Sequence, residues 1–501
     1  MTRLERTTLT TSQKVECAAQ ALTRQAHGAI SALSQAYGVS RPTVYEAGAS
    51  AEAVLARHFQ PGAPEAVSVA VDQAQLRRAV VALRVVAPNS IRAIEELIPL
   101  LYPGQSLSYG KIQQWLVEAE DHAQRFNQQV ALTGIRAGAL DELFSQGDPV
   151  LAGIDLDSGY LFALAVGEDR SAQTWAQLLD QGRTQGLDLE VVVKDAAPGI
   201  AAGVTAVFAD AEQRDDCFHA YYQLGKICQR LERRAYAAIL REQDLQDTLG
   251  RTRARERKRR LGLKQQLAWA RRKCTQAIAE YDTAASAAEQ MRSAMSWVDL
   301  DTGTLRTAPD IQAGICQAAQ ALRTINYRGC RKVATYLTNR ALGLATYARE
   351  LHRQLSALIP VYGQQAVSLA AVIVQRRDDL LQHRQPWQRR EQSQHLLGAY
   401  QHLCQQLGER ADTLLQQVLG LWQQRHRASS AIEGFNASLR PYLYVHKGVS
   451  AGFLALYQAY YNLRTRRWGR HKKTSAYQVL SGHTNSDWLT MLGCAPSRTL
   501  P

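Results

Sequence analysis

The sequence predicts an α/β core with a mixed sheet, preceded by an all-α N-terminal region and interrupted by a large all-α insertion. Three observations favour this fold class. From Leu151 the apolar residues change from helical to strand-like spacing, Leu187–Val193 is typical of a strand buried on both faces, and residues 225–425 carry almost no strand signal. At 501 residues the chain exceeds what one hydrophobic core usually serves, so we expect two to four domains.

Composition indicates a class of partner and a compartment. With 59 Lys and Arg against 45 Asp and Glu, the net charge of +14 favours a polyanion such as nucleic acid. The apolar segment Ala79–Ala87 is short and contains Arg84, and no apolar run follows Met1, so we expect no membrane span, no signal peptide and a cytoplasmic location. The eight cysteines form no CxxC pair, which favours reduced thiols over a structural zinc site.

Residues 1–60 are expected to form a helix-turn-helix DNA-binding domain. A short amphipathic helix over Ala29–Tyr37 is followed by a tight turn, and Ser40 is placed to cap the next helix. Arg41, Thr43 and Tyr45 would then lie at the N-terminal end of a recognition helix, where side chains can reach a major groove. An αα-corner without DNA contact has the same sequence pattern, so both alternatives remain open.

Residues 61–148 are expected to form a second helical region for DNA binding or dimerisation. Pro61–Pro64 is typical of a linker. Ser90 and Ser108 are expected to cap helices over Ile91–Tyr102 and Tyr109–Asn127. Lys111 on the second of these helices can read DNA or serve packing alone.

Residues 149–224 are expected to form the first part of the α/β core. Gly153–Val166 is typical of a β-hairpin, and Asp155 would stand in its apolar first strand. A carboxylate buried in a strand is costly unless it is paired, hydrogen-bonded or bound to metal. The alternative is that Asp155 and Asp157 only shape the turn.

The remaining core elements follow in order along the chain. Ser171 is expected to cap a helix that ends near Arg183, and Leu187–Val193 would carry Asp195 at the C-terminal end of a central strand. Active-site residues often occupy such strand ends. Val204–Phe208 is expected to be one more strand, after which a helix opens near His219.

Residues 225–425 are expected to be an all-helical insertion domain. The run from Arg251 to Arg260 holds seven basic residues in ten and can grip DNA phosphates, or it can be a solvated helix face. The basic residues are Arg251, Arg253, Arg255, Arg257, Lys258, Arg259 and Arg260. Trp269, Trp297 and Trp387 are expected to belong to the core of the insertion, and contact with a flipped DNA base stays open as the alternative for each of them.

Residues 426–464 are expected to return to the core as a helix in which Glu433, Asn436 and Arg440 lie on one side. Glu433 alone would be an ordinary surface glutamate, and its neighbours on the helix make it a candidate site residue. Asn436 and Arg440 are expected to contact DNA. Residues 465–501 form a basic tail in which Lys472 and Lys473 are expected to bind DNA as well.

Together these motifs resemble a DDE transposase of the bacterial insertion-sequence type over about residues 150–480. The resemblance rests on the order of Asp155, Asp195, the Asp216–His219 element and the segment SSAIEGFNASLR around Glu433, with a long helical insertion between the last two. The spacing from Asp216 to His219 is similar to the C/D-x-x-H element of the group that contains hAT-like and Mutator-like transposases. This resemblance implies an RNase H-like catalytic core.

The resemblance also implies a reaction and a set of ligands. Two Mg²⁺ ions, for which Mn²⁺ can substitute, would be held by the carboxylates of Asp155, Asp195 and Glu433 for strand cleavage and strand transfer. His219 would orient the scissile phosphate or a metal ligand, with an indirect supporting role as the equal alternative. The partner would be double-stranded DNA at element ends and target, bound by a homodimer or larger oligomer of a nucleoid-associated bacterial protein, with no membrane contact.

Two other functions fit parts of the sequence. A repressor or domesticated transposase would bind DNA without catalysis, but the three carboxylates are all present. A structure-specific nuclease of the same fold would cut junctions without transposing, but two helical regions suited to sequence recognition favour a transposase.

Overall fold

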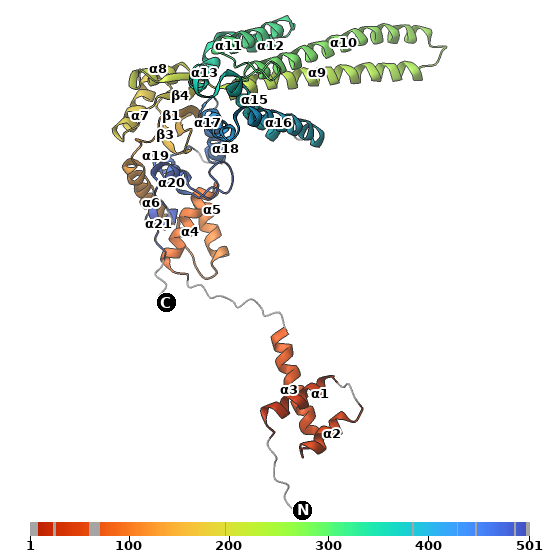
Figure 1. Cartoon of the computed structure of the whole chain (residues 1–501), viewed down its shortest axis with the longest axis vertical. Helices are drawn as coiled ribbons and strands as arrows, with labels where there is room; N and C mark the ends of the chain where they lie inside the picture. The colour runs from red at the N-terminus through yellow and green to blue at the C-terminus, as the bar shows by residue number, and fades with distance from the viewer. Residues whose placement is uncertain are drawn as a thin grey trace, which may run out of the picture. The chain divides into compact units, whose positions relative to one another are not determined.

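A computed structural model of the chain describes residues 9–23, 27–59, 71–195, 197–382, 385–427, 429–445, 448–484 and 487–496. The chain forms two compact units, residues 1–71 and 72–501, which are described separately. The second unit contains a five-stranded mixed sheet and many helices (Figure 1). The expected α/β core with large helical parts is therefore confirmed.

The first unit consists of three helices: α1 (Thr11–Thr23), α2 (Ala29–Ala36) and α3 (Arg41–Phe59). The turn between α2 and α3 contains Gly38, whose φ of 64° favours glycine. The Ser40 hydroxyl accepts a hydrogen bond from the backbone N–H of Thr43 at 3.4 Å, as expected of a cap. Gly48 lets α3 approach α1 closely, because a Cβ there would lie 2.5 Å from Cβ of Ala21. The predicted linker Pro61–Pro64 lies outside the described residues.

The second unit begins with three helices: α4 (Gln73–Val86), α5 (Ile91–Leu101) and α6 (Tyr109–Gln129). The predicted caps are present. The Ser90 hydroxyl accepts from the N–H of Ala93 at 3.1 Å, and the Ser108 hydroxyl accepts from the N–H of Lys111 at 3.3 Å. Local side-chain chemistry thus fixes where these helices start.

The sheet has the strand order β3-β2-β1-β4-β5. Its strands are β1 (Ala137–Ser145), β2 (Asp148–Asp155), β3 (Leu161–Val166), β4 (Val191–Lys194) and β5 (Glu212–Asp215). Strand β2 pairs with β1 and with β3 in antiparallel orientation, whereas β4 pairs with β1 and with β5 in parallel. The predicted hairpin is β2 and β3, and its turn closes through Gly159 at a φ of 67°.

Helices cover both faces of the sheet. On one face α7 (Ala172–Thr184) and α8 (Pro198–Val207) bury Trp175 and Val204 against Leu140 and Phe162. Ser171 caps α7 as predicted, by accepting from the N–H of Thr174. Two helices that follow the insertion pack on other strands: α18 (Ser430–Val445) on β1 and α19 (Ala451–Leu463) on β3. The short helices α20 (Ala476–Ser481) and α21 (Trp488–Met491) come after them.

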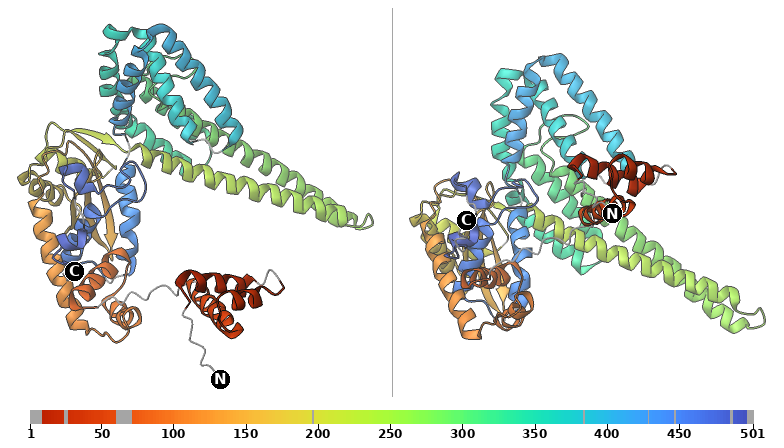
Figure 2. Two further views of the ribbon diagram at one scale, coloured as in Figure 1. Left: turned by 60° about the horizontal axis from the view of Figure 1, so that its bottom comes forward. Right: turned by 90° about the horizontal axis from the view of Figure 1, so that it is seen from below.

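The insertion begins directly after β5. Two long antiparallel helices, α9 (Cys217–Arg251) and α10 (Arg257–Ala294), form a hairpin that extends away from the sheet (Figure 2). The following helices are α11 (Ala308–Thr324), α12 (Arg328–Ala345), α13 (Tyr347–Ser356), α14 (Ile359–Tyr362), α15 (Gln364–Gln382), α16 (Pro386–Leu407) and α17 (Arg410–Gln423). Two hydrophobic cores hold them, one around α9–α13 and one around α15–α17.

Three expectations about the core are wrong. Strand β1 lies within residues 61–148, which were expected to be helical, so the sheet begins earlier than predicted. Val204–Phe208 is not a strand: α8 runs to Val207, where Gly203 allows it to approach Trp175 of α7. The predicted strand Leu187–Val193 is shorter and shifted, because β4 starts only at Val191.

Candidate active site

Two aspartates meet where the parallel strands β1 and β4 lie side by side. The register pairs Leu140 with Lys194, so the next residue on each strand is Asp141 and Asp195. Neighbouring strands are about 4.8 Å apart and paired residues project from the same face. The two carboxylates therefore project from the same face of the sheet, on neighbouring strands.

Helix α18 packs on that face and supplies a third carboxylate. Asn436 of α18 is fully buried and donates from Nδ2 to Oδ2 of Asp141 at 2.6 Å. Glu433, one helical turn earlier, has a side chain that is 28% exposed and has Oε2 3.8 Å from Nη2 of Arg440. The helix thus brings Glu433 near the two aspartates while Asn436 anchors it.

The pKa of Asp141 is affected by the two neighbouring carboxylates. Its pKa is raised to about 7, first by burial and then by the negative charges of Asp195 and Glu433. Hydrogen bonds from the backbone N–H of Glu142 and from Asn436 act in the opposite direction. A carboxylate in this environment gains from a bound cation, because the cation offsets both the burial and the repulsion.

Asp155 does not belong to this cluster, contrary to the prediction. It pairs with Gly138, three residues from Asp141 along β1, so it projects from the opposite face of the sheet about 10 Å away. Its Oδ2 accepts hydrogen bonds from the N–H of Ser158 at 2.8 Å and from the Ser158 hydroxyl. The Asp155 carboxylate is used to close the β2–β3 turn, which is the alternative that the sequence left open.

Asp141 was missed because β1 was not recognised. Its composition gave little signal: in AGALDELF, residues 137–144, Ala, Gly, Asp and Glu are depleted in strands, and only Leu140, Leu143 and Phe144 are large apolar residues. Glu142, the neighbour of Asp141, points to the other face, where its carboxylate accepts from Nε1 of Trp175 at 3.1 Å.

Asp216 joins the two ends of the insertion. Its carboxylate caps α9 by accepting from the N–H groups of Phe218 and His219. The same carboxylate accepts from the N–H and the hydroxyl of Ser429 at 3.0 and 2.7 Å. Since Ser429 directly precedes α18, this 3% exposed carboxylate fixes the start of the Glu433 helix.

The side chain of His219 has partners within the fold. Its Nε2 lies 3.0 Å from Nε2 of Gln223, and its ring contacts the ring of Tyr336 with centroids 6.0 Å apart. These contacts agree with an indirect supporting position.

The donors around Asp141 suit a hard divalent cation, since all of them are oxygens. No three His, Cys, Asp or Glu side chains among the described residues are close enough together to hold a metal ion as they stand.

The structure contradicts one predicted DNA contact and leaves another open between DNA reading and packing. Asn436 is 0% exposed and bonds to Asp141, so the predicted DNA contact is wrong for it. Lys111 is half-buried, with Nζ 3.2 Å from the Gln114 side chain and 5.2 Å from the centre of the Trp115 ring.

The other predicted DNA contacts lie on exposed surface. Arg41 and Tyr45 are exposed on the first turns of α3, with Thr43 between them partly exposed. Lys472 and Lys473 are exposed in a tail segment that folds over the β2–β3 turn, where Arg466 donates to the carbonyl of Ser158 at 2.7 Å.

The basic run lies at the tip of the α9–α10 hairpin rather than along one helix. Its exposed members are Arg251, Arg253, Arg255, Arg257, Lys258 and Arg259. Arg260 instead closes the tip, by donating to the carbonyls of Thr252 at 2.6 Å and Leu249 at 3.2 Å.

Among the tryptophans, the expectation of a core position is correct only for Trp297, which is 1% exposed and stacks on Trp422. Trp269 and Trp387 are 57% and 65% exposed.

A family model described as a transposase matches residues 152–352. The match supports a transposase of the insertion-sequence type. The matched region contains Asp195, His219 and the α9–α10 hairpin, and it lies between Asp141 and Glu433. A comparison with curated proteins gives no match. Within the residues that the structure describes, no helix combines the length and apolar character needed to cross a membrane.

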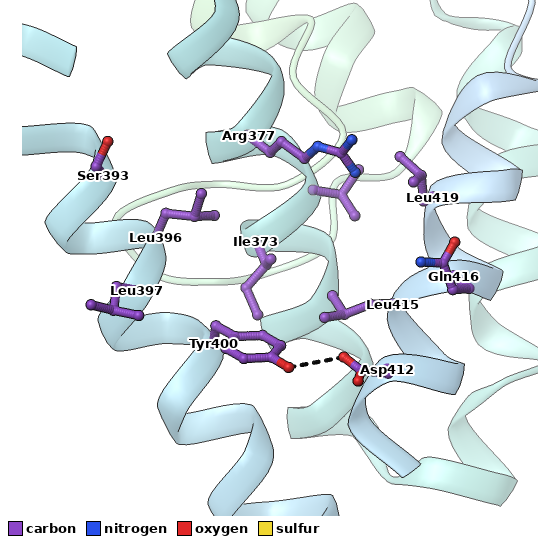
Figure 3. Close-up of a pocket in the computed structure, with 11 residues that line it drawn as sticks. Ile373, Arg377, Ser393, Leu396, Leu397, Tyr400, Asp412, Leu415, Gln416 and Leu419 are labelled. Carbon is purple, nitrogen blue, oxygen red and sulfur yellow. Dashed lines mark hydrogen bonds between the residues drawn. The ribbon is translucent and has the colours of Figure 1, made fainter. Parts of the chain in front are cut away.

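A cavity of about 510 Å³ lies away from the carboxylates, between α15, α16 and α17 (Figure 3). Its walls are mostly apolar, with Ile373, Leu396 and Leu415 among them, and the Tyr400 hydroxyl donates to Asp412 at its edge. It belongs to the packing of the second core of the insertion.

Proposed function

We propose that this chain is a DNA transposase that cleaves and joins strands at the ends of a mobile element, with a catalytic set of Asp141, Asp195 and Glu433. The observation that carries the proposal is the convergence of Asp141 and Asp195 on adjacent parallel strands beneath the helix of Glu433. The transposase match over residues 152–352 supports the same function.

An RNase H-like core is part of this proposal. Three antiparallel strands followed by two parallel ones, in the order β3-β2-β1-β4-β5, support it, as does the position of a carboxylate on the central strand β1. The spacing from Asp216 to His219 supports a relation to hAT-like and Mutator-like enzymes.

The carboxylates of Asp141, Asp195 and Glu433 would hold two Mg²⁺ ions, or Mn²⁺ in their place. When bound, such ions activate the attacking oxygen and stabilise the leaving 3′ oxygen. Asn436 orients Asp141 through its amide, and Arg440 is a charge partner of Glu433 at 3.8 Å. Asp216 positions the start of α18 through Ser429. His219 has no direct role in the proposal.

The exposed cations would bind the phosphates of double-stranded DNA, and α3 of the first unit would read its sequence. We include a dimer or larger assembly on DNA by analogy with other transposases.

The test is cleavage of a labelled duplex that carries the end of the element, with Mg²⁺ present. D141N should lose at least about a hundredfold in rate, because metal-binding carboxylates act as a unit. D155N keeps one oxygen for the turn and should stay within about threefold of the wild type once folding is verified. The opposite pattern, with D155N inactive and D141N active, would restore the assignment made from sequence.

A further inference from the structure

Helix α9 exposes a stripe of aromatic and basic side chains that starts two residues after Asp216. The stripe consists of Phe218, Tyr222, Lys226, Gln229, Arg233 and Tyr236, all exposed. Since successive helical residues turn by about 100°, these six lie within about 80° of arc and extend over roughly 27 Å. They therefore form one continuous face.

The large side chains of this face are not used by the hydrophobic core. Phe218, Tyr222 and Tyr236 are 41%, 49% and 62% exposed. The core of the insertion instead takes the opposite face of α9, which carries Leu224 and Leu231. Exposed aromatic residues in a row point to an interaction surface, because their burial would be favourable.

The first two aromatic rings of the stripe have an orientation that suits stacking with flat ligands. The rings of Phe218 and Tyr222 are nearly parallel, at 11°, with centroids 6.3 Å apart. Lys226 Nζ lies 4.2 Å from the centre of the Tyr222 ring. Lys226 and Arg233 have no carboxylate partner among the described residues, so their charges are available to an anion.

The stripe connects two parts of the proposed catalytic apparatus. At its start, the N–H of Asp216 donates to the carbonyl of Lys194, the residue before Asp195. At the far end of α9 lies the basic tip of the hairpin, Arg251–Lys258. A DNA strand that runs from the carboxylates along α9 would therefore pass the aromatic rings first and the basic tip next.

We propose that this face of α9 binds an unpaired DNA strand, with bases stacked on Phe218 and Tyr222 and phosphates paired with Lys226 and Arg233. In a duplex the base faces are covered by neighbouring pairs, so duplex binding needs the cations and gains nothing from the rings. Base stacking on aromatic side chains is favourable for every base, which makes the surface tolerant of sequence. The position of this DNA strand next to the carboxylates rests on the proposed function.

The test measures binding of a fluorescein-labelled 20-nucleotide oligothymidylate and of a labelled 20-base-pair duplex by anisotropy, in EDTA. F218L/Y222L keeps apolar bulk and removes both aromatic planes. W387L removes an exposed aromatic ring from α16, outside the stripe, and is the matched control. Circular dichroism and sedimentation velocity verify the fold and the oligomeric state of each protein.

F218L/Y222L should bind the oligothymidylate at least about tenfold more weakly and the duplex within about twofold of the wild type. W387L should bind both as the wild type does. F218W/Y222W, which restores flat rings, should recover the oligothymidylate affinity.

Three results would overturn the proposal: no binding of the oligothymidylate by the wild type, equal losses for both DNAs, or unchanged DNA binding with a change of oligomeric state, which would make the stripe a contact between copies. The measurement is independent of the carboxylates. If the wild type did not cleave, the proposed function would fail, and if D141N kept full cleavage, only the proposed catalytic set would fail; the strand-binding result would stand in both cases.

Discussion

Replacing Asp141 by asparagine should stabilise the metal-free protein at neutral and alkaline pH. The folded protein raises the pKa of Asp141 from 3.8 to about 7, mainly by burial and then through Asp195 and Glu433. Between these two values the folded state binds one proton more than the unfolded state. The contribution of Asp141 to stability is therefore fully present below pH 4 and falls by about 1.4 kcal/mol per pH unit until pH 7, a total of about 4 kcal/mol.

The asparagine can be accommodated by the existing hydrogen bonds. The D141N side-chain oxygen can still accept from the N–H of Glu142. Its amide would face Asn436, whose buried Oδ1 has no partner among the described residues, so a flip of the Asn436 amide provides an acceptor. The flip places Nδ2 of Asn436 where its unpartnered Oδ1 stood, so the substitution removes a charge at the cost of one unpaired amide. That cost does not depend on pH and cancels when two pH values are compared.

The assay is urea unfolding in EDTA at pH 5 and at pH 8, followed by circular dichroism. The advantage of D141N over the wild type should grow by about 3 kcal/mol between the two values. D148N, which changes an exposed aspartate at the start of β2, is the control and should show no such growth. Mg²⁺ at pH 8 should stabilise the wild type and leave D141N unaffected, because the ion needs the Asp141 carboxylate.

An advantage that is the same at pH 5 and pH 8 would refute the reasoning, because it would mean that the Asp141 carboxylate is neither buried nor close to other carboxylates. If the stability advantage of D148N also grew between pH 5 and pH 8, the effect would come from the loss of one negative charge and not from the surroundings of Asp141.

Three further predictions concern other parts of the chain. Asp216→Ala should cost about 3 kcal/mol and strongly reduce cleavage, since it removes the cap of α9 and leaves the donors of Ser429 unpaired; thermal unfolding and cleavage assays check this. Arg41→Ala should relax sequence preference, whereas R255Q/K258Q should weaken binding of all DNA sequences alike and flatten its salt dependence, as measured by anisotropy against several duplexes. Arg260→Ala should instead open the hairpin tip and increase amide hydrogen exchange there, because it loses two carbonyl contacts.

Each of these has a matched comparison. Asp210→Ala changes an exposed aspartate of the same region and should cost less than about 0.5 kcal/mol. Equal loss of specificity from Arg41→Ala and R255Q/K258Q would remove the distinction between base and phosphate contacts. Unchanged exchange at the tip in Arg260→Ala would show that its carbonyl contacts do not close the hairpin.

The sequence by itself determined the local features of this protein. Ser90, Ser108 and Ser171 were predicted as helix caps and are caps, because the hydrogen bond that starts a helix joins residues three apart. The β2–β3 hairpin and the helical character of the insertion follow from the spacing of apolar residues within short segments. Asp195 and Glu433 were candidates on the same local grounds, and their metal-binding role stays a prediction.

Only the tertiary structure decided which carboxylates converge. Asp141 meets Asp195 through a register between strands more than fifty residues apart, and Glu433 comes from a helix that follows the whole insertion in the sequence. A change of one position in that register would turn Asp141 to the other face, as the opposite orientations of Asp141 and Glu142 illustrate. Asp155 is also an aspartate that follows an apolar strand residue, but strand pairing places it at a turn. The identity of the first carboxylate is thus a property of long-range pairing, which no local pattern encodes.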